Sequence, residues 1–296
     1  MATTLYTQRS RNVWRTALLM TVFLAIVTGI GYFVAYYYQN PVFLYIAIGF
    51  AVFMNVYSYW FSDKQVLSMT GAKPATRQEY FDFYTITENL AITAGLPMPK
   101  LYVIDDPAPN AFATGRNEKH AVVAATTGLL AMLSRTELEG VIAHELSHIK
   151  NKDMLVMTVA VVLAGFVAII ADMFSHMALW GGGNNDNDSR AAGVLMIVGI
   201  VAIILAPIAA QLIQLAISRR REYLADASGA LLTRYPEGLA SALQKISSYS
   251  RPMKRASHAT AHLFIGNPFG AKAGNWMNAL FSTHPPTEKR VQALLG

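Results

Sequence analysis

Cysteine is absent from the 296-residue sequence, and charged residues are scarce. Without cysteine, a disulfide framework and a thiolate-ligated metal site are excluded, so a metal ion could be held only by histidine and carboxylate side chains. Charged residues make up 14% of the chain and hydrophobic residues 53%, whereas roughly 25% of an ordinary soluble domain is charged. This deficit indicates that much of the surface faces something other than water.

The hydrophobic residues gather in four segments, at residues 16–38, 41–61, 154–180 and 191–217. The first two carry no charge and have the length of about twenty residues needed to cross a bilayer. The first is too long for a cleaved signal peptide, so we expect an uncleaved anchor. The last two contain polar residues such as Asp172, and they could span the bilayer or form a long buried helical hairpin. We favour spanning, which predicts four transmembrane helices.

Basic residues flank these segments on one side only. They precede the first and third segments and follow the second and fourth: Arg9, Arg11, Arg15, Lys64, Lys73, Arg77, Lys150, Lys152, Arg219, Arg220 and Arg221. The two opposite loops are almost free of positive charge, which predicts that both chain ends and the central region are cytoplasmic. This flanking pattern accounts for the net charge of +6, so no nucleic-acid partner is expected.

The segments outside the apolar runs, residues 62–153 and 218–296, predict a small α+β domain in two parts. Thr76 and Ser134 are each followed three residues later by a glutamate, a capping-box pattern that predicts two helix starts. Gly95 is expected to end the first of these helices. Short strands are expected at residues 100–104, 112–113 and 121–125.

The second predicted helix carries the pattern His-Glu-x-x-His. His144 and His148 are four residues apart, so they share one helix face, a geometry that holds a zinc ion from one side. Glu145 lies about 100° round the helix and could take a proton from a water on that ion without being a ligand. A chance match in a chain of this length is a roughly 1% event, given the false-positive risk of the motif.

A catalytic zinc ion usually has three protein ligands, and no third ligand is close to His148. Asn151 and Met154 stand where the extended metzincin pattern has glycine and histidine, which excludes that class. The next candidate is Glu222, with Asp226 one turn later on the same helix face. This spacing suits a ligand and a carboxylate that orients an imidazole, and equally a solvated helix end paired with arginines.

Several motifs in combination resemble a known family. HELSH (residues 144–148) is preceded by NAFATG (110–115) and followed by an apolar hairpin, EYLAD (222–226) and THPPTEKR (283–290). The chain thereby resembles the HtpX family of membrane zinc metalloproteases, in the wider group that includes the CAAX prenyl proteases. The resemblance covers nearly the whole chain. Departures just after HELSH and around residues 227–229 concern the shape of the substrate cleft rather than the ligands.

The resemblance implies a role for each motif residue. His144 and His148 match two zinc ligands, and Glu222 matches the third. Glu145 matches the catalytic base. Asp226 matches a supporting carboxylate that is hydrogen-bonded to His144.

The resemblance also implies residues that handle the substrate. Asn110, with Ala111 and Phe112, matches a segment that binds the substrate main chain beside the cleft. His284 matches a histidine that reaches the substrate carbonyl during the reaction. Arg290 matches a basic position near the acidic ligand helix.

The expected protein is then an α-helical membrane protein, with about four transmembrane helices and a small α+β zincin-like domain. Its parts would be an N-terminal anchor (1–61), the first part of the domain (62–153), a transmembrane hairpin (154–217) and the second part of the domain (218–296). One Zn²⁺ per chain is expected, and the lipid bilayer is the expected surrounding. The oligomeric state is left open.

The resemblance implies an endopeptidase of protein quality control. It would cut misfolded or damaged membrane proteins at the cytoplasmic face of the bacterial inner membrane. Two alternatives stand beside this reading. One is a narrow processing peptidase, akin to the prenyl proteases, and the other is a non-catalytic membrane scaffold that keeps a protease fold.

Overall fold

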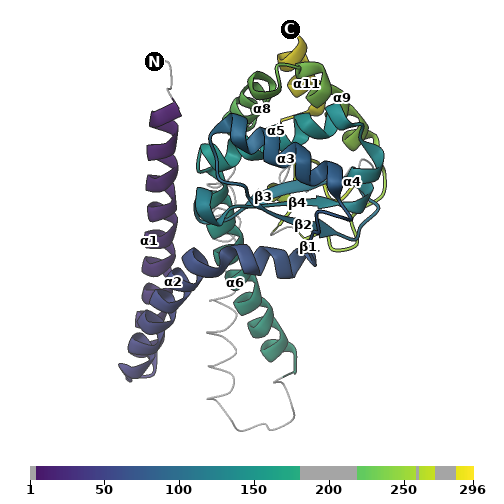
Figure 1. The fold of residues 1–296 in the computed structure, drawn as a ribbon. Helices are drawn as coiled ribbons and strands as arrows, with labels where there is room; N and C mark the ends of the chain where they lie inside the picture. The colour runs from purple at the N-terminus through teal and green to yellow at the C-terminus, as the bar shows by residue number, and fades with distance from the viewer. Residues whose placement is uncertain (1–4, 181–218, 258–259, 271–284) are drawn as a thin grey trace.

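The computed structural model describes residues 5–180, 219–257, 260–270 and 285–296. Three long apolar helices extend beyond the rest of the molecule at one end, and the first part of the first helix also runs alongside the rest (Figure 1). They are α1 (Leu5–Tyr37), α2 (Val42–Thr70) and α6 (Asp153–Trp180). Within the described residues, two stretches are long and apolar enough to cross a membrane, Ser10–Tyr37 and Val42–Thr70. The first three apolar segments thus form helices, and the fourth, residues 191–217, lies outside the described residues.

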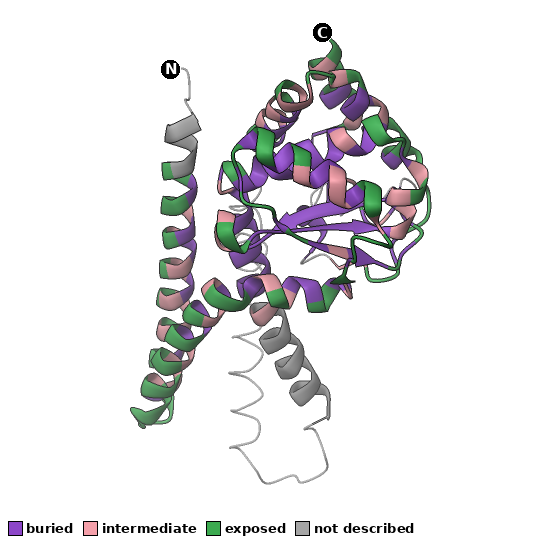
Figure 2. Ribbon diagram, in the orientation of Figure 1, coloured by how far each residue is buried: buried purple, intermediate pink, exposed green. Residues whose placement is uncertain are grey.

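The three long helices pack on one another through apolar side chains. Leu19 and Phe23 of α1, Met54 of α2, and Val159 and Leu163 of α6 are buried in one cluster. The outer faces of α1 and α2 instead expose large apolar and aromatic side chains (Figure 2), among them Tyr32, Tyr36, Tyr45, Ile46 and Phe53. Such an apolar surface, with tyrosines near the helix ends, is typical of helices that a bilayer covers.

Helix α2 continues beyond Phe61, the expected end of the anchor, and reaches Thr70. Its last turns bury Val66 and Leu67 in a second apolar cluster, beneath the sheet of the domain. The charged residues after Phe61 do not end the helix, because they lie on the face that is not fully buried, where Lys64 is exposed. The expected boundary between anchor and domain therefore falls inside one continuous helix.

The domain is built on a four-stranded sheet with the strand order β1-β2-β4-β3 (Figure 1). The strands are β1 (Lys73–Pro74), β2 (Lys100–Ile104), β3 (Ala111–Thr114) and β4 (Val122–Thr126). β2 and β4 are parallel, and the other neighbours are antiparallel. The three predicted strands are present, with ends that differ by no more than about one residue, the usual uncertainty of such boundaries. β1 was not predicted, because two residues carry no alternating pattern.

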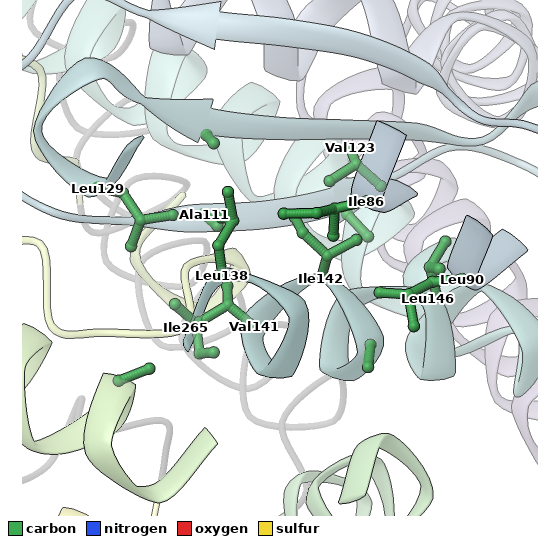
Figure 3. Packing of buried hydrophobic residues seen from close by; sticks show 14 of the residues in the cluster. Ile86, Leu90, Ala111, Val123, Leu129, Leu138, Val141, Ile142, Leu146 and Ile265 are labelled. Carbon is green, nitrogen blue, oxygen red and sulfur yellow. The ribbon is translucent and has the colours of Figure 1, made fainter. Parts of the chain in front are cut away.

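Helices α3 (Phe81–Ala94) and α5 (Arg135–Lys150) pack on the sheet through the main core. Ile86 and Leu90 of α3 face Ile142 and Leu146 of α5, with Val123 of β4 above them (Figure 3). Full burial of a side chain of this size contributes roughly 1.5–3 kcal/mol. The core therefore fixes the position of α5, the helix that carries the histidine pair.

The remaining elements complete the domain. They are α4 (Thr127–Met132), α8 (Arg219–Thr233), α9 (Pro236–Ser248), α11 (Thr287–Leu295) and the 3₁₀ helices η1 (Glu118–His120) and η2 (Ala261–Leu263). α8 and α9 both pack on α5, and α11 packs on α9. Gly140 makes the contact of α5 with α9 possible, because a Cβ there would lie 2.6 Å from the backbone nitrogen of Leu239. Segments on the two sides of residues 154–217 thus pack on each other.

The two predicted helix starts differ in outcome. At Ser134 the capping box is present, and the Ser134 N–H donates to Glu137 at 2.8 Å. At Thr76 the prediction is wrong, because α3 begins only at Phe81. The Thr76 hydroxyl accepts from the N–H of Glu79 at 3.3 Å and so stabilises a turn ahead of the helix.

Glu137 joins the start of α5 to α9. Its carboxylate accepts hydrogen bonds from Ser241 at 2.6 Å and from Lys245 at 2.8 Å. Burial alone would raise the pKa of Glu137, but the bonds from Lys245, Ser241 and Ser134 outweigh it and lower the pKa to about 2. The folded-state pKa thus lies below the unfolded value, so this stabilisation is complete above about pH 4.5 and is lost as the pH falls towards 2.

We expect Glu137→Gln to lower the free energy of unfolding by roughly 1.5–3 kcal/mol at pH 7, the usual range for hydrogen bonds to a charged group. The measurement is thermal unfolding of the detergent-solubilised protein from pH 7 to pH 3. The difference from the wild type should shrink as the pH falls below about 4.5, because the wild-type carboxylate is then being protonated. Glu139→Gln, two residues further along α5 and more exposed, is the control and should stay near the wild type. Equal stability of wild type and Glu137→Gln at pH 7 would contradict this assignment.

Candidate metal centre

The centre forms where α5 and α8 touch. His144, Glu145 and His148 of α5 are buried, as are Glu222 and Asp226 of α8. The two helices approach each other closely at Gly229 of α8. A Cβ at this position would lie 3.0 Å from the backbone nitrogen of His144 in α5. The main core holds α5 in place, so α8 is brought to a fixed rotation against the histidine face.

Three side chains point their donor atoms at one another. The Nε2 atoms of His144 and His148 are 3.1 Å apart. Glu222 places Oε2 at 3.8 Å from Nε2 of His144 and Oε1 at 3.5 Å from Nε2 of His148. One donor atom from each residue lies within 4.8 Å of the others. Two imidazole nitrogens and one carboxylate constitute a donor set that suits zinc, and they leave a position for water.

Each imidazole has a carboxylate near Nδ1, the nitrogen that does not point at the other ligand candidates. Nδ1 of His144 lies 2.9 Å from Asp226, and Nδ1 of His148 lies 3.2 Å from Asp153. A carboxylate at Nδ1 favours a proton on that nitrogen, which leaves Nε2 free as a ligand. The structure thus places Asp226 next to His144. Asp153 was missed, although an acidic residue at the start of an apolar segment and five residues after His148 was a usable signal.

Arg290 reaches the same cluster from α11. Its guanidinium donates to both carboxylate oxygens of Asp226, with Nε at 2.8 Å and Nη2 at 2.6 Å. Nη1 lies 3.7 Å from Glu222. This paired geometry is the strongest that arginine forms with a carboxylate. Arg290, placed near the acidic helix by resemblance alone, therefore fixes the carboxylate that orients His144.

The charge of the centre favours a cation. Burial raises the pKa of Glu145 to about 7, and the nearby Glu222 adds to this effect. Burial lowers the pKa of His148, but Asp153, Glu222 and Glu145 outweigh burial and raise it to about 9. The first shift arises mainly from burial, and the second from the three carboxylates around His148, so the histidine pair lies among acidic groups. The residues present therefore fit a bound divalent metal ion.

Strand β3 passes beside the centre at the edge of the sheet. The backbone of Ala113 lies close to the carboxylate of Glu145 and acts to lower its pKa. Ala111 and Phe112 are buried, and the side chain of Asn110 pairs with the backbone of Gly266, donating to its carbonyl and accepting from its N–H, each at 3.0 Å. The predicted contact of these three residues with substrate stays a prediction, and His284 lies outside the described residues.

Comparison with known proteins agrees with this geometry. The model of a family described as Peptidase family M48 matches residues 78–296. The chain belongs to peptidase family M48. It is 46% identical over 296 residues to a protein named Protease HtpX homolog from Caldanaerobacter subterraneus subsp. tengcongensis, with 98% of this chain and 97% of that protein covered. It is 50% identical over 286 residues to a protein of the same name from Pyrococcus furiosus, with 96% and 95% covered.

A solved structure supports the fold of this M48 chain. The crystal structure of S. mikatae Ste24p matches with a TM-score of 0.52 at 18% sequence identity, covering 96% of this chain and 66% of that one. At this identity the likeness concerns the fold alone. Family membership and the apolar helices together make the chain a membrane metalloprotease.

The roles of Asp226 and Glu222 in this M48 centre can be tested by measuring the affinity for zinc. We expect Asp226→Asn to weaken zinc binding by roughly 10–100-fold, the usual effect of removing a partner of a ligating histidine. Glu222→Ala should weaken it more, because a ligand is removed. The measurement is competition with a chelator of known affinity, using metal-stripped protein. Glu237→Ala, an exposed glutamate outside the centre, is the control. Wild-type affinity in Glu222→Ala would show that the third ligand has been misassigned.

Proposed function

We propose that this M48 chain is a zinc-dependent endopeptidase in which His144, His148 and Glu222 hold the metal and Glu145 is the catalytic base. The observation that carries the proposal is the convergence of two imidazoles and a distant carboxylate within 4.8 Å, with Glu145 next to a ligand on the same helix. An intact Glu145 speaks against a scaffold that merely keeps a protease fold, since such a protein has no need of a buried carboxylate at this position.

A zinc ion held by these residues would supply Lewis-acid activation of water and of the scissile carbonyl. Glu145 would accept the proton of the attacking water as its oxygen bonds to the carbonyl carbon. It would then return this proton to the amide nitrogen as the C–N bond breaks, so that a carboxylate and an amine leave. The pKa of Glu145, raised to about 7 by burial, suits a group that must both take and give a proton near neutral pH.

The remaining residues would orient and stabilise. Asp226, fixed by Arg290, would keep the outer nitrogen of His144 protonated. The substrate would lie as an extended strand along the edge at β3, a mode that recognises backbone more than side chains. Asn110 would contact its main chain, and His284 would stabilise the oxyanion that develops on the carbonyl.

The proposed setting is the bacterial cytoplasmic membrane. Two further spans in residues 154–217 would give four in all, and the basic residues around them favour a cytoplasmic active site. The anchor, the hairpin and the two parts of the domain would follow the predicted order along the chain. Substrates would be misfolded or damaged membrane proteins, as the resemblance to the HtpX family implies.

The base is tested separately from the ligands. Glu145→Gln should abolish hydrolysis of a casein-type substrate while the protein keeps its zinc, because the side chain is assigned no bond to the metal. Activity and zinc content are measured on the same preparation, with Glu139→Gln from the exposed face of α5 as the control. Loss of zinc together with activity would mean that Glu145 is a ligand rather than the base.

The topology is tested with reporter fusions. Fusions after Lys73 and at Gly296 should score cytoplasmic, and a fusion within residues 181–190 should score on the opposite side of the membrane. The basis is the asymmetry of the basic residues around the apolar segments. A cytoplasmic score for the 181–190 fusion would leave the hairpin on one side and reduce the count of spans to two.

A further inference from the structure

A polar side chain of the first apolar helix reaches the carboxylate behind His148. Asn12 of α1 is fully buried, and its side-chain amide donates to Oδ1 of Asp153 at 2.6 Å and to the backbone carbonyl of Asn151 at 3.0 Å. The other oxygen of Asp153, Oδ2, lies 3.2 Å from Nδ1 of His148. One carboxylate thus connects a proposed metal ligand to a helix more than a hundred residues earlier in the chain.

The acceptor end of the same amide is also used. Nη1 of Arg221 donates to Oδ1 of Asn12 at 3.3 Å, and Nε of Arg221 lies 3.6 Å from Oδ1 of Asp153. Arg221 directly precedes Glu222, the proposed third ligand, and it is buried, although the sequence pattern counted it among the basic residues that flank the membrane. Asn12 therefore bridges the turn after α5 and the start of α8, and α5 and α8 are the helices that carry the proposed ligands.

This arrangement differs from what anchoring alone requires. Further along α1, the buried contacts with α2 and α6 are made by apolar side chains such as Leu19 and Phe23. A buried amide is costly unless both its donor and acceptor groups are satisfied, and an apolar residue would anchor the helix at lower cost. Figure 1 shows the first turns of α1 level with the soluble domain rather than with the far ends of α2 and α6. The contacts of Asn12 with Asp153 and Arg221 place its amide beside the metal centre.

We propose that Asn12 is a positioning residue of the metal centre, and that α1 is a structural part of the active site as well as an anchor. Asn12 holds Asp153 at the orientation in which its other oxygen fixes the outer nitrogen of His148. Through Arg221 it also sets the start of α8 relative to α5. The inference rests on the proposed metal site, and it adds a residue that makes no contact with metal or substrate.

The test uses the full-length protein in detergent, with zinc affinity measured by chelator competition and the visible absorption spectrum of the cobalt-substituted protein as a second readout. Asn12→Leu keeps the branched shape of the side chain and removes the amide. We expect it to weaken zinc binding by about 10-fold, the lower end of the range for outer partners of a ligating histidine, and to shift the cobalt spectrum. Thr16→Val, one turn along the same helix, removes a bond within α1 only and should leave both readouts unchanged.

Exchanging the amide at position 12 with the carboxylate at position 153 distinguishes a positioning role of Asn12 from a general loss of packing. Asn12→Asp alone sets two carboxylates against each other and should weaken zinc binding. Asn12→Asp combined with Asp153→Asn restores a donor opposite an acceptor, and it leaves an amide oxygen for His148. The combined variant should recover zinc affinity and the cobalt spectrum towards the wild type. Should Asn12→Leu not fold, this recovery still decides the matter.

The outcomes distinguish this inference from the proposed function. If Glu222→Ala loses zinc while Asn12→Leu keeps wild-type affinity and spectrum, the metal site stands and the role of Asn12 is overturned. Failure of the combined variant to improve on Asn12→Asp also overturns it. Absence of zinc binding in the wild type overturns both proposals.

Discussion

The contact between α5 and α8 is the constraint on which the rest of the site depends. Gly229 allows α8 to approach the backbone at His144, and this approach brings Glu222 to within 3.8 Å of the histidine pair. Several charged groups are buried together there, and a buried charge is tolerated only when it is paired or binds a metal. Arg290 and Asp226 are therefore needed for the same reason as the proposed ligands. Each pairs with a charged or polar group that the contact between α5 and α8 has removed from water.

The sequence was most informative where a local pattern determines local structure. The spacing of His144 and His148 placed both side chains on one helix face, and the capping box at Ser134 marked the start of that helix. Thr76 has the same pattern yet caps a turn, because the apolar residues that α3 buries begin only after Phe81. A pattern of this kind predicts a local hydrogen bond more reliably than the packing that decides where a helix starts.

Contacts between distant segments were less accessible to such reasoning. Glu222 could be named as a ligand only through resemblance, since its spacing suited a solvated helix end equally well. Asp153, Arg221 and Asn12 lie in or beside apolar segments, where polar residues were interpreted as interruptions or flanking charges. Asn12 is separated from both Asp153 and Arg221 by more than a hundred residues, and hydrophobic periodicity carries no information over such a distance. The family, the sheet and the two anchor helices were predicted, whereas the polar network behind His148 was not.

The order of the segments along the chain has a consequence for synthesis. A ribosome produces His144, Glu145 and His148 well before Glu222, and residues 154–217 must emerge in between. The packing around α5 is also incomplete until α8 and α9 have been synthesised, since both helices pack on α5. A nascent chain that has not yet extended past residues 154–217 therefore has the histidine pair without its carboxylate partner on α8. Domains generally fold as units during translation, so competence of this enzyme is delayed until the chain has passed its last apolar segment.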